Sequence, residues 1–203
     1  MDPHPDSWPS WNRDEEDAIR SALDALGTHP DPRGRVQELA AAHTSREDNV
    51  WAALGQAPLA RAVGHLAELA DRVATASTAT DLKTQIAWYS DEGHVIDDLA
   101  LRTIATAKTA QDRSAVAHAL AAIYDPWVDQ SARAFQKAAI SAYSGQTGLD
   151  VAAGTCVVYV DALRYDLATR VARRLSGLAA VVEPRQAAFP SVCLLYPSDA
   201  ADE

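Results

Sequence analysis

The chain has 203 residues, of which 48% are hydrophobic and 23% charged, and this is the composition of an ordinary globular protein. Its formal net charge of -10 argues against broad non-specific binding to nucleic acid or to anionic lipid. No apolar run reaches the roughly 20 residues of a membrane-spanning helix. The first residues also lack the basic and apolar regions of a signal peptide, so we expect a cytoplasmic protein.

Helical signals dominate the first 142 residues, because alanine and leucine are abundant and glycine is scarce. We expect residues 1–12, which are proline-rich, to be disordered. Asn12 or Asp14, Thr44 or Ser45, and Thr80 or Asp81 are the expected helix caps, and Gly93 is an expected break. The predicted helices cover approximately residues 13–26, 33–43, 45–54, 59–73, 81–90, 95–104, 113–123 and 127–142.

The pattern changes after a loop at residues 145–154. Residues 155–160, TCVVYV, form a short β-branched and aromatic run, which is typical of a strand buried on both faces. A helix is predicted from Leu163 to Leu175, with Gly177 ending it, and a second strand over residues 178–182. The expected fold is therefore a mainly α N-terminal helical bundle (13–150) followed by the first βαβ unit of an α/β domain (151–192).

Asp161 stands directly after the first predicted strand. In an open α/β sheet, ligands bind beyond the carboxyl ends of the strands, and a carboxylate held there is a suitable ligand for a divalent cation. Asp is also a preferred N-cap, so Asp161 could equally begin the Leu163 helix. The spacing alone leaves the two roles evenly balanced.

The hexapeptide Asp161-Ala162-Leu163-Arg164-Tyr165-Asp166 resembles the opening motif of PglZ-domain proteins, in which a hydrophobic strand runs into D-[AG]-L-R-[YF]-[DE]. The segment Tyr124-Asp125-Pro126-Trp127 through Phe135-Gln136, and Trp88-Tyr89 with Gly93, are similar to the region that precedes this motif. The resemblance implies an alkaline-phosphatase-like α/β domain that hydrolyses phosphate esters. It also implies a site with divalent metal ions, zinc being the first expectation, for which Asp161 is the first ligand.

The same family carries a loop of the form L-P-[ST]-x-T-x-x-G-M, and residues 189–192, FPSV, resemble its beginning. The threonine expected as nucleophile would fall at position 193, which is Cys193, so Ser191 is only a weak catalytic candidate. Residues 193–203, CLLYPSDAADE, resemble a translated sequencing adapter. We therefore expect a non-native tail, a natural sequence that ends near Val192, and a truncated fragment that is inactive and binds no metal stably.

The charged residues around the motif allow two roles. Arg164 could contact a phosphate, or it could bridge to Asp166 or to the helical bundle, and we favour the bridge. The cluster Arg170, Arg173 and Arg174 is expected to be a solvated helix face. Asp97 and Asp98 are likewise expected to be solvated, because adjacent helix positions point apart, with Asp98 as a partial exception.

Two functions are compatible with these patterns. The resemblance implies a metal-dependent phosphatase or phosphodiesterase in bacterial anti-phage defence of the BREX or phage-growth-limitation kind, with other defence proteins as partners and no membrane association. Nucleic acid is a possible partner of the full-length protein, but the net charge does not support it. The alternative is a non-catalytic interaction module, in which the helical bundle docks a partner in a defence complex.

Overall fold

The computed structural model describes residues 8–77, 79–142, 153–154, 160 and 163–177, with the side chains of all of these except 141 and 142. Within these ranges the chain is mainly helical and contains no strand, which confirms the helical bundle. The predicted strand at 178–182 and all but the last residue of the strand at 155–160 lie outside the described residues, so the βαβ unit stays a prediction. No helix in the described ranges combines the length and the apolarity needed to cross a membrane.

The α-helices are, in order, α1 (Pro9–Asp24), α2 (Pro32–His43), α3 (Val50–Ala53), α4 (Pro58–Ala74), α5 (Leu82–Trp88), α6 (His94–Thr106), α7 (Ala110–Ile123), α8 (Asp125–Ala142) and α9 (Tyr165–Ser176). Short 3₁₀ turns follow α1 and α2 at Ala25–Thr28 and Thr44–Arg46. A π-helical turn, Tyr89–Gly93, joins α5 directly to α6 and is called the π segment below.

Helix α4 is the centre of the bundle, because apolar residues line more than one of its faces. Leu59, Val63, Leu66 and Leu69 are fully buried. Ala60, Ala62 and Ala70 are buried between them, and their small side chains let neighbouring helices approach closely. Helices α1, α2, α6 and α7 all pack against α4. The helical spacing predicted over 59–73 is thereby confirmed.

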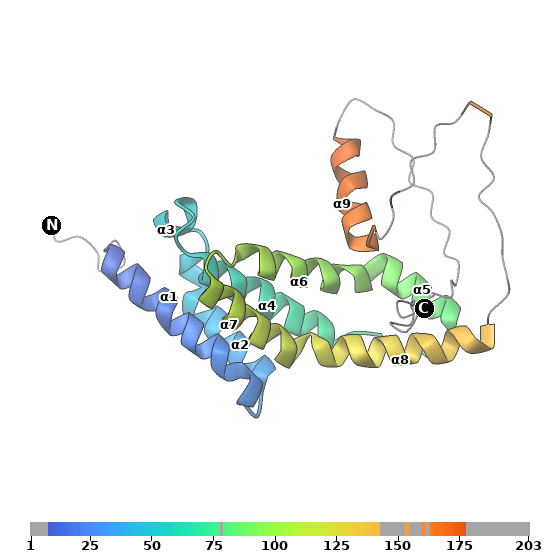
Figure 1. The fold of residues 1–203 in the computed structure, drawn as a ribbon, viewed down its shortest axis with the longest axis horizontal. Coiled ribbons are helices and arrows are strands. Elements are labelled where there is room, and N and C mark those ends of the chain that lie inside the picture. The colour runs from blue at the N-terminus through green and yellow to red at the C-terminus, as the bar shows by residue number, and fades with distance from the viewer. Residues whose placement is uncertain (1–7, 78, 143–152, 155–159, 161–162, 178–203) are drawn as a thin grey trace, which may run out of the picture.

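The bundle is extended at one end by α8, which continues in nearly the direction of α7 (Figure 1). Helix α5 packs against α8 at this end. Helix α9 stands across α6, away from the rest of the bundle, and α6 is the described helix that it contacts most. The described part of the predicted α/β domain therefore meets the helical bundle through α6 and the π segment.

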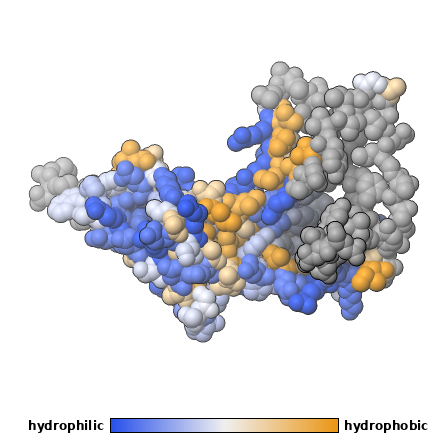
Figure 2. Space-filling model, viewed as in Figure 1, coloured by the Kyte–Doolittle hydropathy of each residue, from blue (hydrophilic) through white to orange (hydrophobic). Residues whose placement is uncertain are grey.

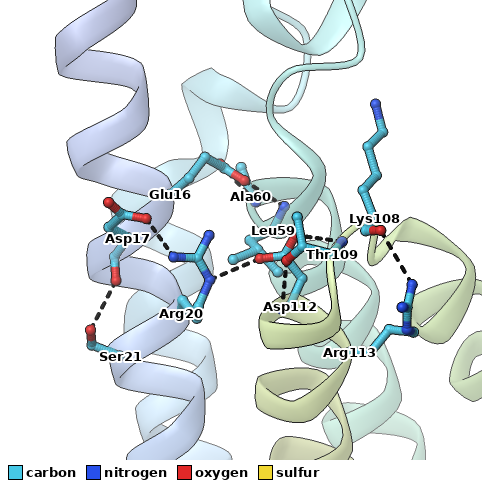
Figure 3. A network of polar contacts seen from close by, with 10 residues as sticks. All are labelled: Glu16, Asp17, Arg20, Ser21, Leu59, Ala60, Lys108, Thr109, Asp112 and Arg113. Atoms are coloured by element: carbon cyan, nitrogen blue, oxygen red, sulfur yellow. Dashed lines mark hydrogen bonds and ion pairs between the residues drawn. The ribbon is translucent and has the colours of Figure 1, made fainter.

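A buried carboxylate from α1 completes the start of α4. Ala57, the N-cap residue of α4, has no side-chain acceptor. Instead, Glu16 Oε2 accepts a hydrogen bond from Leu59 N at 2.7 Å (Figure 3). Its Oε1 accepts one from Arg46 Nη2 at 2.9 Å. These contacts supply a partner for an unsatisfied amide at the helix N-terminus. They also compensate the charge of Arg46, which is 2% exposed.

Some predicted boundaries were wrong. Helix α1 begins at Pro9 rather than after residue 12, with Trp8 as its N-cap, so residues 9–12 are helical and Asn12 is a buried partner of Arg46. The expected helix 45–54 is a 3₁₀ turn followed by the short α3, which Asn49 caps. Asp81 caps α5 by accepting from Thr84 N, as predicted.

Gly93 does not break the helix. It is buried within the π segment, and the chain continues from it into α6 without leaving helical geometry. A Cβ built on Gly93 would lie 2.6 Å from Trp88 Cζ3 and 2.9 Å from Tyr89 Cδ2. Glycine is therefore present here because two aromatic rings approach the backbone, and not because the chain turns.

Candidate functional site

The hexapeptide motif is only partly within the described residues. Asp161, the predicted metal ligand, and Ser191, the weak catalytic candidate, lie outside them, so both assignments stay predictions. The described part of the motif begins α9: Arg164 is its N-cap residue, and Tyr165 and Asp166 form its first turn. The candidate site can therefore be built from Arg164 onward and from what these three residues contact.

Arg164 bridges the motif to the helical bundle. Its Nε donates to Asp166 Oδ1 at 3.1 Å, within its own helix, and its Nη2 lies 3.6 Å from Asp97 Oδ2 on α6. The side chain is 45% exposed, so each contact is partly screened by water. Both predicted bridges of Arg164 are present in the structure, and a contact with phosphate stays a prediction.

Asp97 is the point where three separate segments meet. Its two carboxylate oxygens accept one tyrosine hydroxyl each at 2.5 Å, Oδ2 from Tyr89 of the π segment and Oδ1 from Tyr124 between α7 and α8. Such distances are typical of hydroxyl hydrogen bonds to an ionised carboxylate. Burial raises the pKa of both tyrosines, and the hydrogen bonds to Asp97 raise it further, so both remain protonated donors.

The prediction that Asp97 and Asp98 are solvated is wrong. The two residues are 9% and 7% exposed. Asp98 Oδ2 lies 2.7 Å from Arg102 Nη2 one turn along α6, and its Oδ1 accepts from Arg170 Nε of α9. The side chains do point apart, as adjacent helix positions must, but each direction leads to a partner contributed by a distant part of the chain.

Arg170 therefore does not belong to a solvated face either. Besides its bond to the Asp98 carboxylate, its Nη2 donates to the Asp98 backbone oxygen at 3.3 Å. Arg173 and Arg174, one turn further, are exposed as predicted. The basic cluster of α9 thus divides into one arginine that contacts the bundle and two that face solvent.

Tyr165 packs against the π segment and the start of α6. Its ring lies 5.3 Å from the ring of His94, edge to face, and 6.0 Å from that of Tyr89. Its hydroxyl donates to the backbone oxygen of Ser90 at 3.2 Å. Tyr165 therefore contributes aromatic packing to this junction, and its hydroxyl adds a polar contact.

Asp166 is fully buried, although it lies in the first turn of a surface helix. Its Oδ1 accepts from Arg164, whereas its Oδ2 has no hydrogen-bond partner in the part of the chain that the structure describes. A negative charge is favoured at this helix position by the helix dipole. Complete burial of such a carboxylate is costly without pairing, and the contact with Arg164 offsets part of that cost.

The charges at this junction balance. Three carboxylates face three guanidinium groups, and we call these six residues the polar cluster: Asp97, Asp98, Asp166, Arg102, Arg164 and Arg170. Both oxygens of Asp97 and both of Asp98 are occupied by donors, so these two aspartates do not fit as metal ligands. Among the described residues, the polar cluster can join α9 to the bundle but offers no free ligand set.

A groove of about 400 Å³ begins beside the polar cluster and runs between α6 and α7. Its polar end is formed by Asp97, Tyr124, Asp125 and Arg164, and Arg113 lies elsewhere on its wall. Its apolar lining consists of Ala100, Leu101, Ile104, Val116, Ala117, Leu120 and Ala121. Figure 2 shows apolar surface gathered in the middle of the molecule, where α6 and α7 lie in Figure 1.

Comparison with known proteins identifies no relative: no family model, no curated protein and no solved structure matches the chain. The site therefore has to be interpreted from its own residues. Sequence reasoning missed Asp97 and Asp98 as members of the site. It did mark two of their neighbours, because Tyr89 and Tyr124 lie in the segments that resemble the region upstream of the hexapeptide motif.

Proposed function

We propose that this chain contributes the N-terminal part of a metal-dependent phosphate-ester hydrolase of the PglZ type, acting in anti-phage defence. Asp161 would be the first metal ligand. The domain that follows the helical bundle would have an alkaline-phosphatase-like α/β fold. The other ligands and the nucleophile would be supplied by sequence downstream of Val192, as the resemblance implies.

One observation carries this proposal. The resemblance rests on three stretches that are far apart in the sequence, around Tyr89, Tyr124 and Arg164, and in the structure all three contact Asp97. Trp88 and Trp127, from the first two stretches, also pack edge to face at 6.5 Å. Segments that resemble one family by chance have no reason to meet at one carboxylate, so their convergence supports a shared origin.

The residues of this chain would divide the chemical work as follows. A bound divalent cation supplies Lewis-acid stabilisation of the negative charge that develops on a phosphate ester during hydrolysis. Asp161 offers it a hard oxygen ligand. Asp97 and Asp98 are saturated by their own partners, so they would support the position of α9 and not bind the ion.

The test is hydrolysis of a chromogenic phosphodiester by a chain that continues through the T-x-x-G-M loop and the downstream Asp and His ligands. We expect activity that a chelator removes and zinc restores, and that Asp161→Asn abolishes. Asp129→Asn is a matched control, since it removes an exposed carboxylate on α8 that pairs with Arg133 of the same helix. Equal activity of Asp161→Asn and the unchanged chain would refute the metal role of Asp161.

The α6–α7 groove favours a second function, that of an interaction module. Ile104 is 47% exposed at its edge, and small alanines line it, as in grooves that accept a helix of another protein. A variant in the groove distinguishes the two functions, because phage defence and phosphodiester hydrolysis can be measured separately. Substituting Ala117 by Glu in the groove would impair phage defence without changing phosphodiester hydrolysis if the helical domain acts by binding.

A further inference from the structure

Helix α9 meets the bundle with its polar side. Asp166 and Arg170 are one turn apart and both belong to the polar cluster. Val171 and Leu175, also one turn apart, are 49% and 43% exposed on another face. An amphipathic helix that belonged to the bundle would be turned the other way, with its apolar stripe inward. The contact between α9 and the bundle is therefore held by polar interactions and not by burial of an apolar face.

The surface that receives α9 includes an irregular part of the bundle. The π segment places the Ser90 carbonyl where the Tyr165 hydroxyl donates to it, and it places Tyr89 where it contacts both Asp97 and the Tyr165 ring. A π-helical turn is rare and is frequently found at functional sites. Here its consequence is local: it provides a backbone acceptor and an aromatic ring to the first turn of α9.

We propose that Asp97 and Asp98 of the helical domain are positioning residues that fix the start of α9, and thereby regulate the hydrolase site proposed above. This inference rests on the proposed function. Asp161 stands three residues before Arg164, and three peptide units span at most about 11 Å. The contact between Arg164 and Asp97 would consequently limit the distance of the Asp161 carboxylate from the bundle. Loss of that contact would remove the limit.

The arrangement makes the positioning adjustable. The side chains of Arg164 and Arg170 are 45% and 35% exposed, so their ion pairs are reached by water and by salt. Polar interfaces of this kind within a chain allow relative motion of the two parts. Loss of these ion pairs would therefore release α9 without unfolding the bundle.

The docking itself is tested on the 203-residue chain by amide hydrogen exchange. An isolated helix of 12 residues is marginal in water, so an undocked α9 should lose its protection. We expect Asp98→Asn and Arg170→Gln to speed amide exchange in α9 while α4 stays protected. Arg170→Lys, which keeps the positive charge, should retain much of the protection of α9. Glu92→Gln is the control, because Glu92 is exposed on the π segment. Unchanged exchange in α9 would overturn the docking role of these residues.

The functional consequence is tested on the chain that includes the downstream ligands. We expect Asp97→Asn and Asp98→Asn to raise the zinc concentration needed for half-maximal hydrolysis by about 10- to 100-fold, as residues that orient metal ligands do, and Glu92→Gln to leave it unchanged. A purely structural role would reduce the fraction of active enzyme without changing that concentration.

The outcomes for the two proposals are distinct. If Asp161→Asn abolishes hydrolysis but neither α6 variant changes the zinc requirement, the proposed function stands and the positioning role is refuted. If Asp161→Asn leaves hydrolysis intact, the proposed function fails and the positioning role fails with it. In that case the hydrogen exchange result still shows whether α9 is docked by the polar cluster.

Discussion

Arg20 on α1 and Asp112 on α7 form an ion pair, with 2.8 Å between Nε and Oδ1, although they are 92 positions apart in the sequence. Asp112 also completes a capping box at the start of α7: its backbone N–H donates to Thr109 Oγ1, and its Oδ2 accepts from Thr109 N. The Asp112 carboxylate thus caps the N-terminus of α7 and also joins that helix to α1 through the ion pair (Figure 3).

Replacing Asp112 by Ala should therefore destabilise the bundle by roughly 2–4 kcal/mol, since the change removes a helix cap and a charge-assisted hydrogen bond together. Urea unfolding followed by circular dichroism measures the loss. The control is Asp17→Ala, which removes the other partner of Arg20 but at a position with a 57% exposed side chain. We expect that control to stay within about 0.5 kcal/mol. Equal losses in the two variants would contradict the role of the capping box.

Acid should weaken the bundle through Asp112. Burial acts to raise the pKa of Asp112, but hydrogen bonds from Arg20 and Thr109 outweigh it, and the pKa lies below the ordinary value of 3.8. A carboxylate with a lowered pKa in the folded state stabilises it above the unfolded pKa, and this contribution is lost as the pH falls through the folded pKa. Unfolding midpoints at pH 7 and pH 3 should therefore differ less in Asp112→Asn than in the unchanged chain.

Glu16 should behave in the opposite way. Burial raises its pKa, and the hydrogen bonds from Leu59 and Arg46 only reduce that shift. The part of its contribution to stability that depends on proton uptake is then present below the ordinary pKa and is lost as the pH rises through the raised value. Acidification to pH 4 should therefore cost the bundle less in the presence of Glu16 than in Glu16→Gln, which cannot take up the proton. A larger acid effect with Glu16 present would contradict this sign.

At neutral pH, Glu16→Ala should destabilise the bundle by about 3–5 kcal/mol, because it leaves the buried charge of Arg46 without its carboxylate. It also leaves Leu59 N without an acceptor at the start of α4. Glu16→Gln keeps an acceptor for that amide, so its loss should be smaller. Differential scanning calorimetry of both variants checks the order, and a smaller loss for Ala than for Gln would refute the capping role.

Features that depend on nearby residues could be predicted from the sequence. The stripe Leu59, Val63, Leu66, Leu69 and Val73 predicted α4, and all five residues are buried. Caps that act within three residues could also be found, as at Asp81. In both cases the residues that form the feature are separated from one another by about one turn of helix. The local sequence pattern is therefore sufficient to predict it.

Features that depend on distant residues could not be predicted in this way. Asp98 was expected to be largely solvated because adjacent helix positions point apart, and its partner Arg170, 72 positions away, gave no local signal. Glu16 gave no sign of capping a helix that begins 42 positions later, because the amide it accepts from belongs to another element. The candidate site consists mainly of such contacts. Its residues could be found from the sequence only where the hexapeptide motif and its upstream segments marked them.

The two tyrosines on Asp97 should be energetically coupled. Tyr89→Phe and Tyr124→Phe each leave one carboxylate oxygen of Asp97 without its donor, which should cost about 1–3 kcal/mol of stability. Because both donors serve one carboxylate, the double variant should differ from the sum of the single variants by 0.5 kcal/mol or more. Simple additivity in urea unfolding would show that the two hydrogen bonds act independently.

Gly93 gives the sharpest test of the π segment. In an ordinary helix interior, replacing glycine by alanine stabilises the chain by up to about 1 kcal/mol. At Gly93 the new Cβ would instead lie 2.6 Å from the Trp88 ring. That ring cannot move away freely, because it packs edge to face on Trp127. Gly93→Ala should therefore destabilise the bundle by about 1–3 kcal/mol, as overpacked cores do.

The matched control for Gly93 is Gly27→Ala, in the 3₁₀ turn after α1. A Cβ on Gly27 meets no atom within 4 Å, so this change should be neutral or stabilising by a few tenths of a kcal/mol. Because the π segment also carries the Ser90 carbonyl that accepts from Tyr165, Gly93→Ala should speed amide exchange in α9 as well. A Gly93→Ala chain as stable as Gly27→Ala, with α9 still protected, would show that the aromatic rings can yield and that the π segment is not required for docking.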